Sequence, residues 1–392
     1  WEQRKLGELV EIGDIDHRMP ETVADGIPYL MTGDFVGTNE LNFDGTKMIS
    51  EEDYCQLSQK IKPEKGDILF ARYASVGAAR YVDFTRKFLI SYSCAIIKKS
   101  KKINSKYLYH FITSGKVQQQ IKLEINTGSQ ANIGIDSMKN HIVVSMPQLE
   151  EQTKIADALS NLDHLITLHQ RKYEKLVNIK KSMLDKMFPK NGASVPEIRF
   201  KGFTDLWEQR KLGEIAVFSK GVGYSKNDLC EEGTPIILYG RLYTKYETCV
   251  FDVDTFVKEK AGSVYSKGGE VIVPASGETA EDISIASVVV KPGILLGGDL
   301  NIVSPTAEYD SAFLALTISS GATHKYLSSL AQGKSVVHLH NSDIQSVSAK
   351  FPTKREQEKI HLIFGKIDTL ITLHQREHIK PILEVKRVKR NE

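Results

Sequence analysis

The chain has 392 residues, of which 41% are hydrophobic and 26% charged, and its formal net charge is +3. This composition is ordinary for a soluble globular protein, and the length predicts two or three domains that can each bury a core. The small net charge excludes any argument for a nucleic-acid or membrane partner from bulk charge, so a basic surface has to be local.

The cysteines and the hydropathy restrict the cellular setting. The four cysteines, Cys55, Cys94, Cys230 and Cys249, are scattered and form no CxxC pair. This spacing argues against a disulfide framework or a structural zinc site and fits a reducing compartment. No apolar run approaches the length of about 18 residues that predicts a membrane span, and no signal-peptide pattern is present. We therefore expect a cytoplasmic protein without a membrane partner. Because the chain begins with Trp, we also expect the native N-terminus to lie upstream of residue 1.

The chain opens with the octapeptide WEQRKLGE, which returns unchanged at 207–214. The hexapeptide LITLHQ is likewise identical at 165–170 and 370–375. These matches are offset by 206 and 205 residues. They indicate the duplication of one large unit, because a solenoid repeats every 20–50 residues or so. The stretches between the matches differ, so the two halves share a frame and vary in content.

The globular part of each half is predicted to be an α+β domain. Residues 1–150 and 207–354 carry runs of Val, Ile, Tyr and Phe between Gly, Asn, Asp and Pro turns, which favours strands. Segments 105–121 and 311–333 are typical of helices and occupy matching places in the two halves. Residues 189–206 form the linker into the second repeat.

A long helix is predicted to follow each globular region. Residues 151–188 form the first helix, with acidic residues near its start, lysines near its end and Pro189 as its stop. Its apolar positions alternate in steps of four and three, which is a heptad seam. The second helix covers 355–392 but contains Pro381, so we expect it to be shorter or kinked.

The two seams predict that the helices pair with each other as an antiparallel coiled coil, which gives the chain a pseudo-two-fold internal repeat. The alternative is that each helix packs only on its own globular half. The seam residues that we assign are Ile155, Leu159, Leu162, Ile166, His169, Tyr173, Leu176, Ile360, Phe364, Ile367, Ile371 and His374.

Together these motifs resemble the specificity subunit of type I restriction–modification enzymes. The resemblance rests on WEQRKLGE after an F-x-G-F lead-in, on PQLEEQTKIA, on LDHLITLHQRKYEKLVNIKKSMLDKMF and on ILYGRLYTKYE, and it covers nearly the whole chain. It implies that each globular region is a target recognition domain for one half of a split, asymmetric double-stranded DNA site.

The resemblance also implies a division of labour with other proteins. The helices act as a spacer and as a docking surface for two methyltransferase subunits, and two motor and nuclease subunits complete the restriction complex. This chain is then not catalytic, and S-adenosylmethionine, ATP and Mg²⁺ are expected on the partner subunits rather than here.

Candidate DNA contacts come from polar and basic loops, since Arg, Lys, Asn and Gln read base edges while Lys, Arg and Ser bind phosphates. The alternative for each residue is an ordinary solvated side chain. In the first half we assign Arg72, Tyr73, Ser75, Arg80, Arg86, Lys87, Thr127, Ser129, Gln130 and Asn132. In the second half we assign Lys220, Tyr224, Lys226, Tyr239, Arg241, Tyr243, Lys245, Lys334, Ser335, His338, His340 and Asn341.

Enzyme signatures are missing from the sequence. His338 and His340 lie two residues apart without a cysteine or carboxylate cluster, so we assign no metal site. The chain has no GxxxxGK[ST] loop, no dinucleotide fingerprint and no methyltransferase or nuclease motif. Two other hypotheses remain: a coiled-coil adaptor that binds only proteins, and a self-contained nuclease or methyltransferase.

Overall fold

The computed structural model describes residues 1–128, 131–190, 192–333 and 336–388, and for residues 376–388 it describes only the helical backbone. The chain forms two compact units, Trp1–Leu168 and His169–Glu392. The boundary between them falls inside the first long helix, so the repeat limits that we expected at 150 and 207 are not the limits of the compact units. The functional extent of each domain stays a prediction.

The repeated octapeptide starts each half in the same way. Strands β1 (Glu2–Lys5) and β12 (Glu208–Lys211) pair antiparallel with β11 (Val143–Met146) and β24 (Ser348–Phe351), the strands that directly precede the long helices. Each octapeptide then buries its leucine, since Leu6 and Leu212 are 0% exposed. The motif therefore joins the beginning of a globular domain to its end, next to the helix.

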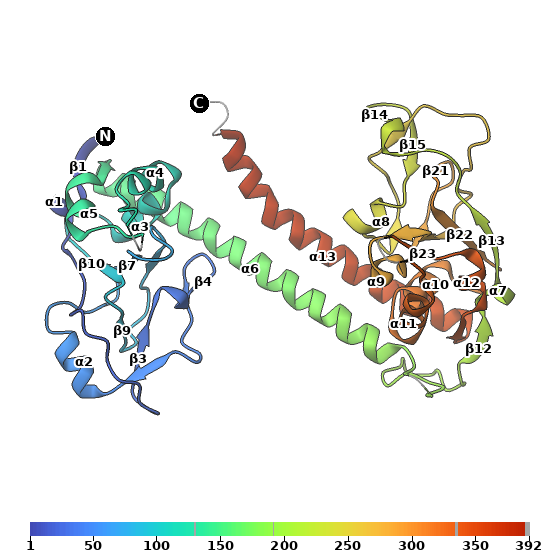
Figure 1. Cartoon of the computed structure of the whole chain (residues 1–392), viewed down its shortest axis with the longest axis horizontal. Helices are drawn as coiled ribbons and strands as arrows, with labels where there is room; N and C mark the ends of the chain where they lie inside the picture. Colours follow the sequence, from blue (N-terminus) through green and yellow to red (C-terminus); the bar gives the residue numbers. More distant parts are fainter. Residues whose placement is uncertain (129–130, 191, 334–335, 389–392) are drawn as a thin grey trace. The chain divides into compact units, whose positions relative to one another are not determined.

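We call residues 1–148, before the first long helix, domain 1, and residues 207–353, before the second, domain 2. Domain 1 contains two main sheets (Figure 1). One has the order β2 (Ile12–Gly13), β10 (Cys94–Ile97), β7 (Ile68–Ala71) and β8 (Ala79–Tyr81). The other has the order β6 (Lys47–Ile49), β3 (Ile27–Leu30) and β9 (Leu89–Ile90), and a hairpin is formed by β4 (Phe35–Val36) and β5 (Glu40–Leu41). The helices are α1 (Leu6–Leu9), α2 (Glu51–Leu57), α3 (Ser105–Thr113), α4 (Gly115–Leu123) and α5 (Ile135–His141).

Domain 2 has larger sheets on a matching frame. A five-stranded sheet has the order β13 (Ala216–Lys220), β22 (Leu300–Pro305), β18 (Glu270–Pro274), β20 (Ser287–Val289) and β16 (Cys249–Val250). A four-stranded sheet has the order β14 (Leu229–Cys230), β17 (Phe256–Val257), β15 (Thr234–Ile237) and β21 (Leu295–Leu296). The short pair is β19 (Ser276–Gly277) and β23 (Val337–His338), and the helices are α7 (Leu212–Ile215), α8 (Arg241–Thr244), α9 (Ala280–Ile283), α10 (Ser311–Ile318), α11 (Gly321–Leu330) and α12 (Asn341–Ser346).

The helical segments predicted inside each domain are confirmed, but each is divided. Segment 105–121 is α3 and α4, which Ser114 separates, and segment 311–333 contains α10 and α11. Asn104 and Asp310 cap α3 and α10 by accepting hydrogen bonds from backbone N–H groups of the first turn. The α+β prediction therefore agrees with the mixed structure of both domains.

The long helices are α6 (Leu149–Met187), of 39 residues, and α13 (Lys354–Val388), of 35 residues. The first ends just before Pro189, as predicted. As expected, the second helix is shorter than the first, by four residues, but α13 continues as a helix through Pro381 rather than ending there. A proline that lacks its N–H removes one hydrogen bond of the ladder, which a long helix can absorb.

Within the second unit, the end of α6 contacts α13 in opposite order along the two helices. His169 Nδ1 lies 2.9 Å from His374 Nδ1, and Lys180 Nζ lies 2.5 Å from a carboxylate oxygen of Asp368. Ile360 and Phe364 are at most 1% exposed, because they belong to the core of domain 2, and Ile367 is 8% exposed. The seam of α13 therefore begins inside its own domain, as the alternative reading expected, and reaches α6 further along. The seam residues before 169 lie in the other unit, and their pairing stays a prediction.

We expect Asp14→Asn to destabilise domain 1 by about 3–5 kcal/mol, because the substitution leaves the Arg72 charge buried without its counter-ion. The carboxylate and the guanidinium are 5% and 6% exposed. Urea denaturation measures this loss of stability, and hydrogen exchange of the amides in β7 and β10 assigns it to domain 1. Lys60→Ala is the control, since the ammonium of Lys60 also pairs with Asp14 but is exposed, so the loss should stay below about 1 kcal/mol. Equal effects of the two variants would contradict the assignment.

The same carboxyl sets an acid limit for domain 1. Burial raises the pKa of Asp14, but hydrogen bonds from His17 and Lys60 and the charge of Arg72 outweigh burial and hold the pKa below its ordinary value. The stabilisation is therefore present above the ordinary pKa and is lost as the pH falls through the lower folded-state pKa. We expect Asp14→Asn to flatten the acid part of the stability curve of domain 1. An unchanged acid limb would contradict this.

Candidate nucleic-acid interface

Two loops come together at the same place in each domain, and we call their described residues loop pair 1 (72–78 with 126–128 and 131–134) and loop pair 2 (275–279 with 332–333 and 336–340). In loop pair 1, Tyr73 bridges Asn132, and the Ile133 N–H donates to the Arg72 carbonyl at 3.1 Å. In loop pair 2, Ser276 pairs with His338, and the Leu339 N–H donates to the Ala275 carbonyl at 3.1 Å. The frame therefore presents corresponding loops from both halves.

The second loop of each pair closes on itself in the same way. Asn126 and Asn132 exchange backbone hydrogen bonds of 2.8 and 3.3 Å, and Gln332 and His338 exchange bonds of 2.8 and 3.1 Å. The two bridges are offset by 206 residues, the offset of the octapeptide. Asn126 and Gln332 both carry a carboxamide, on stems of different length, whereas Asn132 and His338 differ in chemistry. The loop pairs thus combine a fixed backbone with variable side chains.

A different buried side chain supports the same backbone carbonyl in each half. The Arg72 guanidinium donates to the Ile133 carbonyl at 3.0 Å, and the Asn301 amide donates to the Leu339 carbonyl at 2.8 Å. Both supporting residues are buried, at 6% and 0% exposed. A buried carbonyl needs a donor, but any donor that fits can supply it. This is why the loop position is kept while the residue that holds it changes.

Several of the predicted contacts lie at the loop pairs and face solvent. In loop pair 1, Ser75 and Thr127 are exposed, while Tyr73 and Asn132 are half-buried. In loop pair 2, His338 and His340 are exposed, with parallel rings whose centroids are 6.5 Å apart. The predicted residues Ser129, Gln130, Lys334 and Ser335 lie outside the described residues.

Asn341 joins loop pair 2 to the edge strand β13. Its amide Nδ2 donates to the Ser219 carbonyl at 2.9 Å, next to the exposed Lys220. The structure therefore brings Lys220 to the neighbourhood of the histidine loop. Tyr224 and Lys226 follow in the next turn. The Tyr224 hydroxyl accepts from the Lys260 N–H at 2.7 Å, which fixes this turn in the domain.

Three predicted arginines, Arg72, Arg80 and Arg241, point inward, and we remove them from the candidate interface. Arg80 donates to the carbonyls of Glu40, Ala79, Val36 and Gly37. Arg241 pairs with Glu247 at 2.9 Å and Asp254 at 2.6 Å. All three arginines are at most 9% exposed. Their N–H groups donate to carboxylates and backbone carbonyls of their own domain, and these partners hold the side chains inside. Burial also lowers the pKa of Arg80.

Tyr243 and Lys245 also bind within their own domain. The Tyr243 hydroxyl donates to the Ser276 carbonyl at 2.6 Å, so this side chain supports loop pair 2 from below, and burial raises its pKa. Lys245 pairs with Asp254 at 2.9 Å, and hydrogen bonds from Lys245 and Arg241 lower the pKa of Asp254 to about 2. Tyr239 stays exposed beside the Tyr243 ring, with centroids 6.2 Å apart.

Arg86 and Lys87 lie in the segment that precedes β9 of domain 1. The Arg86 guanidinium lies 4.2 Å from the Phe43 ring centroid, and the Lys87 ammonium lies 4.5 Å from that of Tyr54 and pairs with Glu51. Both residues are exposed but are held by these rings. No contact that the structure describes joins them to loop pair 1. They stay candidates for phosphate contact at a second place.

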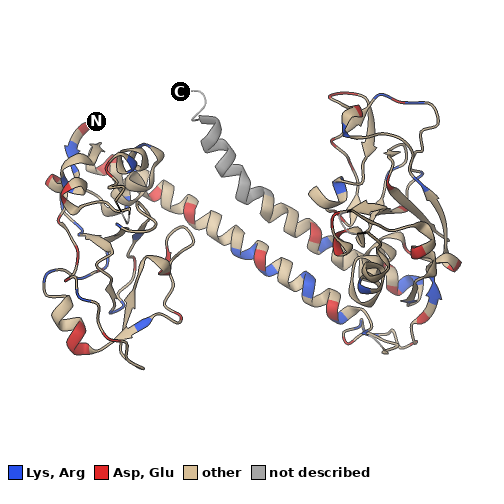
Figure 2. Cartoon of the chain, in the orientation of Figure 1, with Lys and Arg blue, Asp and Glu red and all other residues tan. Residues whose placement is uncertain are grey.

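Asn126, Ser276 and Gln332 belong to the loop pairs but were not among the predicted residues. The offset between the halves makes the predicted residues Asn132 and His338 equivalent. Asn126, Gln332 and Ser276 are found as their partners in the backbone bridges, which only the structure shows. Nothing in the sequence near Asn126 marks it. Figure 2 shows basic residues interspersed with acidic ones on both domains and along α6, so charge alone does not mark the site either.

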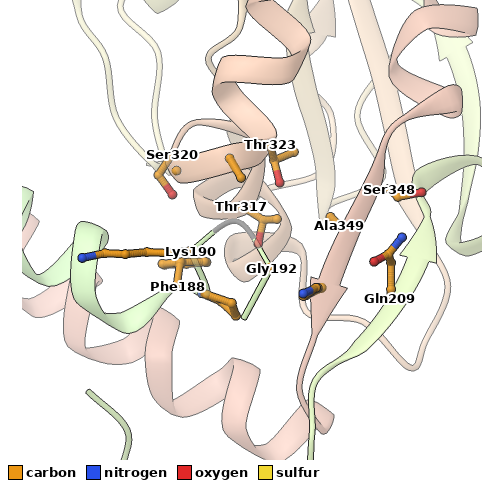
Figure 3. A pocket seen from close by; sticks show the side chains of 13 residues that line it. Phe188, Lys190, Gly192, Gln209, Thr317, Ser320, Thr323, Ser348 and Ala349 are labelled. Atoms are coloured by element: carbon orange, nitrogen blue, oxygen red, sulfur yellow. The ribbon is translucent and has the colours of Figure 1, made fainter. Parts of the chain in front are cut away.

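A hollow of about 490 Å³ lies elsewhere in the second unit, where the linker meets α11 and β24 (Figure 3). Phe188, Gln209, Thr317 and Ser320 are among its lining residues. Its two lysines are occupied: Lys190 pairs with Asp185 at 3.4 Å and Glu197 at 3.5 Å, and Lys350 donates to the Ala193 carbonyl. Within the described residues no group of three or more His, Cys, Asp or Glu side chains gathers as a metal site. No described helix is long and apolar enough to cross a membrane.

Comparison with known proteins decides what the duplicated frame is. The family model of the type I restriction modification DNA specificity domain matches residues 1–178 and 204–383. The chain belongs to this family. It is thus a specificity subunit of a type I restriction–modification system, the component on which DNA sequence specificity depends.

Similar proteins agree over the whole length. The type I restriction enzyme MjaVIII specificity subunit of Methanocaldococcus jannaschii is 23% identical, over 96% of this chain and 88% of that protein. The putative MjaX specificity subunit of the same organism is 24% identical over 96% and 89%. The crystal structure of the type I restriction–modification S subunit from M. genitalium has a TM-score of 0.65 at 16% identity, covering 99% of this chain and 94% of that one, and it shows the shared fold.

We expect Thr127→Ala and Gln332→Ala to weaken DNA binding without lowering the unfolding temperature, because both side chains are exposed at the loop pairs. A lost base contact costs about 1–3 kcal/mol of binding free energy. Thr204→Ala, at an exposed linker position, is the matched control and should change neither quantity. Arg80→Met should instead lower the unfolding temperature. Affinity unchanged in both loop variants would remove the loop pairs from the interface.

Proposed function

We propose that the specificity subunit reads a split, asymmetric double-stranded DNA site, with one half-site bound by each domain through its loop pair. The observation that carries this proposal is the duplicated backbone frame with different side chains on it, Asn126 and Asn132 in one half against Gln332 and His338 in the other. Equivalent loops with equal side chains would favour a palindrome, whereas different side chains favour two unrelated half-sites.

The two long helices are proposed to hold the domains at a fixed separation as an antiparallel coiled coil. The contacts of His169 with His374 and of Lys180 with Asp368 support this pairing in the second unit. A helix advances 1.5 Å per residue, so the helix length determines the length of DNA between the half-sites. The gap in the site is thus a geometric property of the protein rather than of a base contact.

The helices are also the proposed docking surface for two methyltransferase subunits, and two motor and nuclease subunits complete the restriction complex. In this scheme S-adenosylmethionine, ATP and Mg²⁺ bind on those partners, and the specificity subunit positions the methyltransferases without acting on DNA itself. The complex is proposed to work in the bacterial cytoplasm.

Exchange of domain 2 tests the split site. We expect that replacing residues 207–353 with the corresponding region of another specificity subunit changes one half of the methylated sequence and leaves the other half and the gap unchanged. Long-read sequencing of DNA from cells that express the exchanged chain with its methyltransferase measures this. A change in both halves, or in neither, would contradict one half-site per domain. Exchange of residues 1–146 is the reciprocal control.

Salt dependence separates a DNA reader from an adaptor that binds only proteins. We expect the affinity of the complex with its methyltransferase for a duplex to fall steeply with salt concentration, because bound Lys and Arg release counter-ions. Lys220→Ala, at an exposed residue next to the Ser219 carbonyl that binds Asn341, should reduce the slope of log K against log salt by about one. Lys201→Ala, in the linker, should leave the slope unchanged. Affinity that does not depend on salt would favour the adaptor.

A further inference from the structure

One carboxylate of α13 binds groups from two other parts of the second unit. Asp368 forms an ion pair with the ammonium of Lys180, in α6, at 2.5 Å. It also accepts a hydrogen bond from the hydroxyl of Thr248, in domain 2, at 3.0 Å. The site is largely covered, since the Lys180 and Asp368 side chains are 18% and 28% exposed and Thr248 is 6% exposed. Asp368 therefore ties both long helices to domain 2 at one point.

The tie continues into the domain. Thr248 directly precedes β16, which pairs with β20. The N–H group of Val288, in β20, donates to the Thr248 carbonyl at 2.9 Å. The Lys180 ammonium also lies 5.9 Å from the Tyr246 ring centroid, and the Tyr246 hydroxyl donates to the Ala286 carbonyl at 3.2 Å. A movement of α13 against the five-stranded sheet would break these contacts together.

The equivalent carboxylate of the first repeat lies against domain 1. Asp163 and Asp368 both stand two residues before the repeated LITLHQ. An oxygen of Asp163 is 3.7 Å from His110 Nδ1 in α3, and the other ring nitrogen of His110 is 3.0 Å from the Ser160 hydroxyl in α6. The His110 side chain is 9% exposed and the Asp163 side chain 37%, so this contact is covered on the side of the domain and open to solvent on the side of the helix.

The two carboxylates bind different elements. Asp163 lies against a helix of domain 1, whereas Asp368 binds the segment before a strand of domain 2. The carboxylate belongs to the repeated helix and its partner belongs to the variable domain. The same carboxylate position, next to the repeated LITLHQ, thus contacts a different element in each domain.

We propose that Asp163 and Asp368 are positioning residues that fix the orientation of domain 1 and domain 2 on their helices. Neither residue touches DNA in this scheme. This consequence rests on the proposed function: Asp163 and Asp368 determine how strictly the protein measures the gap between the half-sites. The loop pairs determine which bases are read.

Distances between nitroxide labels test the orientation without DNA. Labels carried by unnatural amino acids are placed at the exposed positions 175 in α6 and 258 in domain 2, and in a second protein at 161 in α6 and 65 in domain 1. Asp368→Ala should broaden and shift the 175–258 distance distribution and leave 161–65 unchanged. Asp163→Ala should do the reverse, so each variant is the matched control of the other.

Thr248→Val is a second variant that keeps the test decisive if Asp368→Ala does not fold. It removes only the hydroxyl that binds Asp368 and keeps the shape of the side chain. It should shift the 175–258 distribution in the same direction as Asp368→Ala. If both variants fold and both leave that distribution as in the unaltered chain, the positioning role of Asp368 is wrong. If Asp368→Ala also alters 161–65, the effect is general loosening and the proposal fails.

The gap in the methylated site gives the second readout. Asp368→Ala, expressed with the methyltransferase, should keep both half-site sequences and accept more than one gap length, which loss of a merely structural contact would not produce. A single unchanged gap would overturn the link between this carboxylate and spacing. Failure of the proposed function is a separate result, because the unaltered chain would then give no split site while the label distances would still decide the positioning role.

Discussion

The second half of the molecule depends on the packing of one aromatic ring, that of Phe188, which directly follows the last residue of α6. It stacks on Phe313 of α10 with centroids 5.4 Å apart and meets Trp207 and Phe364 at 6.1 and 6.4 Å. Four segments therefore share one core: the end of the first helix, the first residue of the second octapeptide, domain 2 and the start of the second helix. Aromatic residues contribute large buried areas and defined contact geometry, so this core fixes the helix end on the domain.

The same constraint explains why the repeated sequences are where they are. The octapeptide forms the strand that pairs with the strand before each long helix, and its buried leucine packs beneath. These residues build the strand pair and the buried leucine at the junction of domain and helix in both halves, whereas Trp207 is buried and Trp1 is exposed. The exposed side chains of the loop pairs can vary because backbone hydrogen bonds, not these side chains, hold the loops together. A duplicated specificity subunit thereby separates the residues that hold a domain from those that we propose to read DNA.

The elements that sequence predicts well are those whose signal is local or repeated. The heptad steps and Pro189 predict α6 to within two residues, and the matching motifs predict a duplicated frame. Pro381 predicts a shorter second helix, and α13 is four residues shorter than α6, although it continues through the proline to Val388. The offset of 206 also predicts that loops 126–132 and 332–338 correspond, which the backbone bridges bear out.

The candidate site was harder to predict because a basic side chain has the same appearance in sequence whether it faces solvent or the core. Arg72 binds Asp14, which is 58 residues away, and Arg80 binds carbonyls of the β4–β5 hairpin more than 40 residues away. No local pattern indicates such partners. The exposed residues Ser75, Thr127, His338 and His340 remain as candidates for DNA contact because the structure leaves their side chains at the surface of the loop pairs.

The most direct test of the central claim is to map adenine methylation by long-read sequencing in cells that lack other methyltransferases. The methyltransferase subunit is expressed with this chain and, separately, without it, and the two proteins are shown to co-purify. The account predicts a split motif of two short half-sites around a fixed gap that disappears when this chain is omitted. A motif that is unchanged without this chain, or no methylation when the two proteins form a complex, would contradict it.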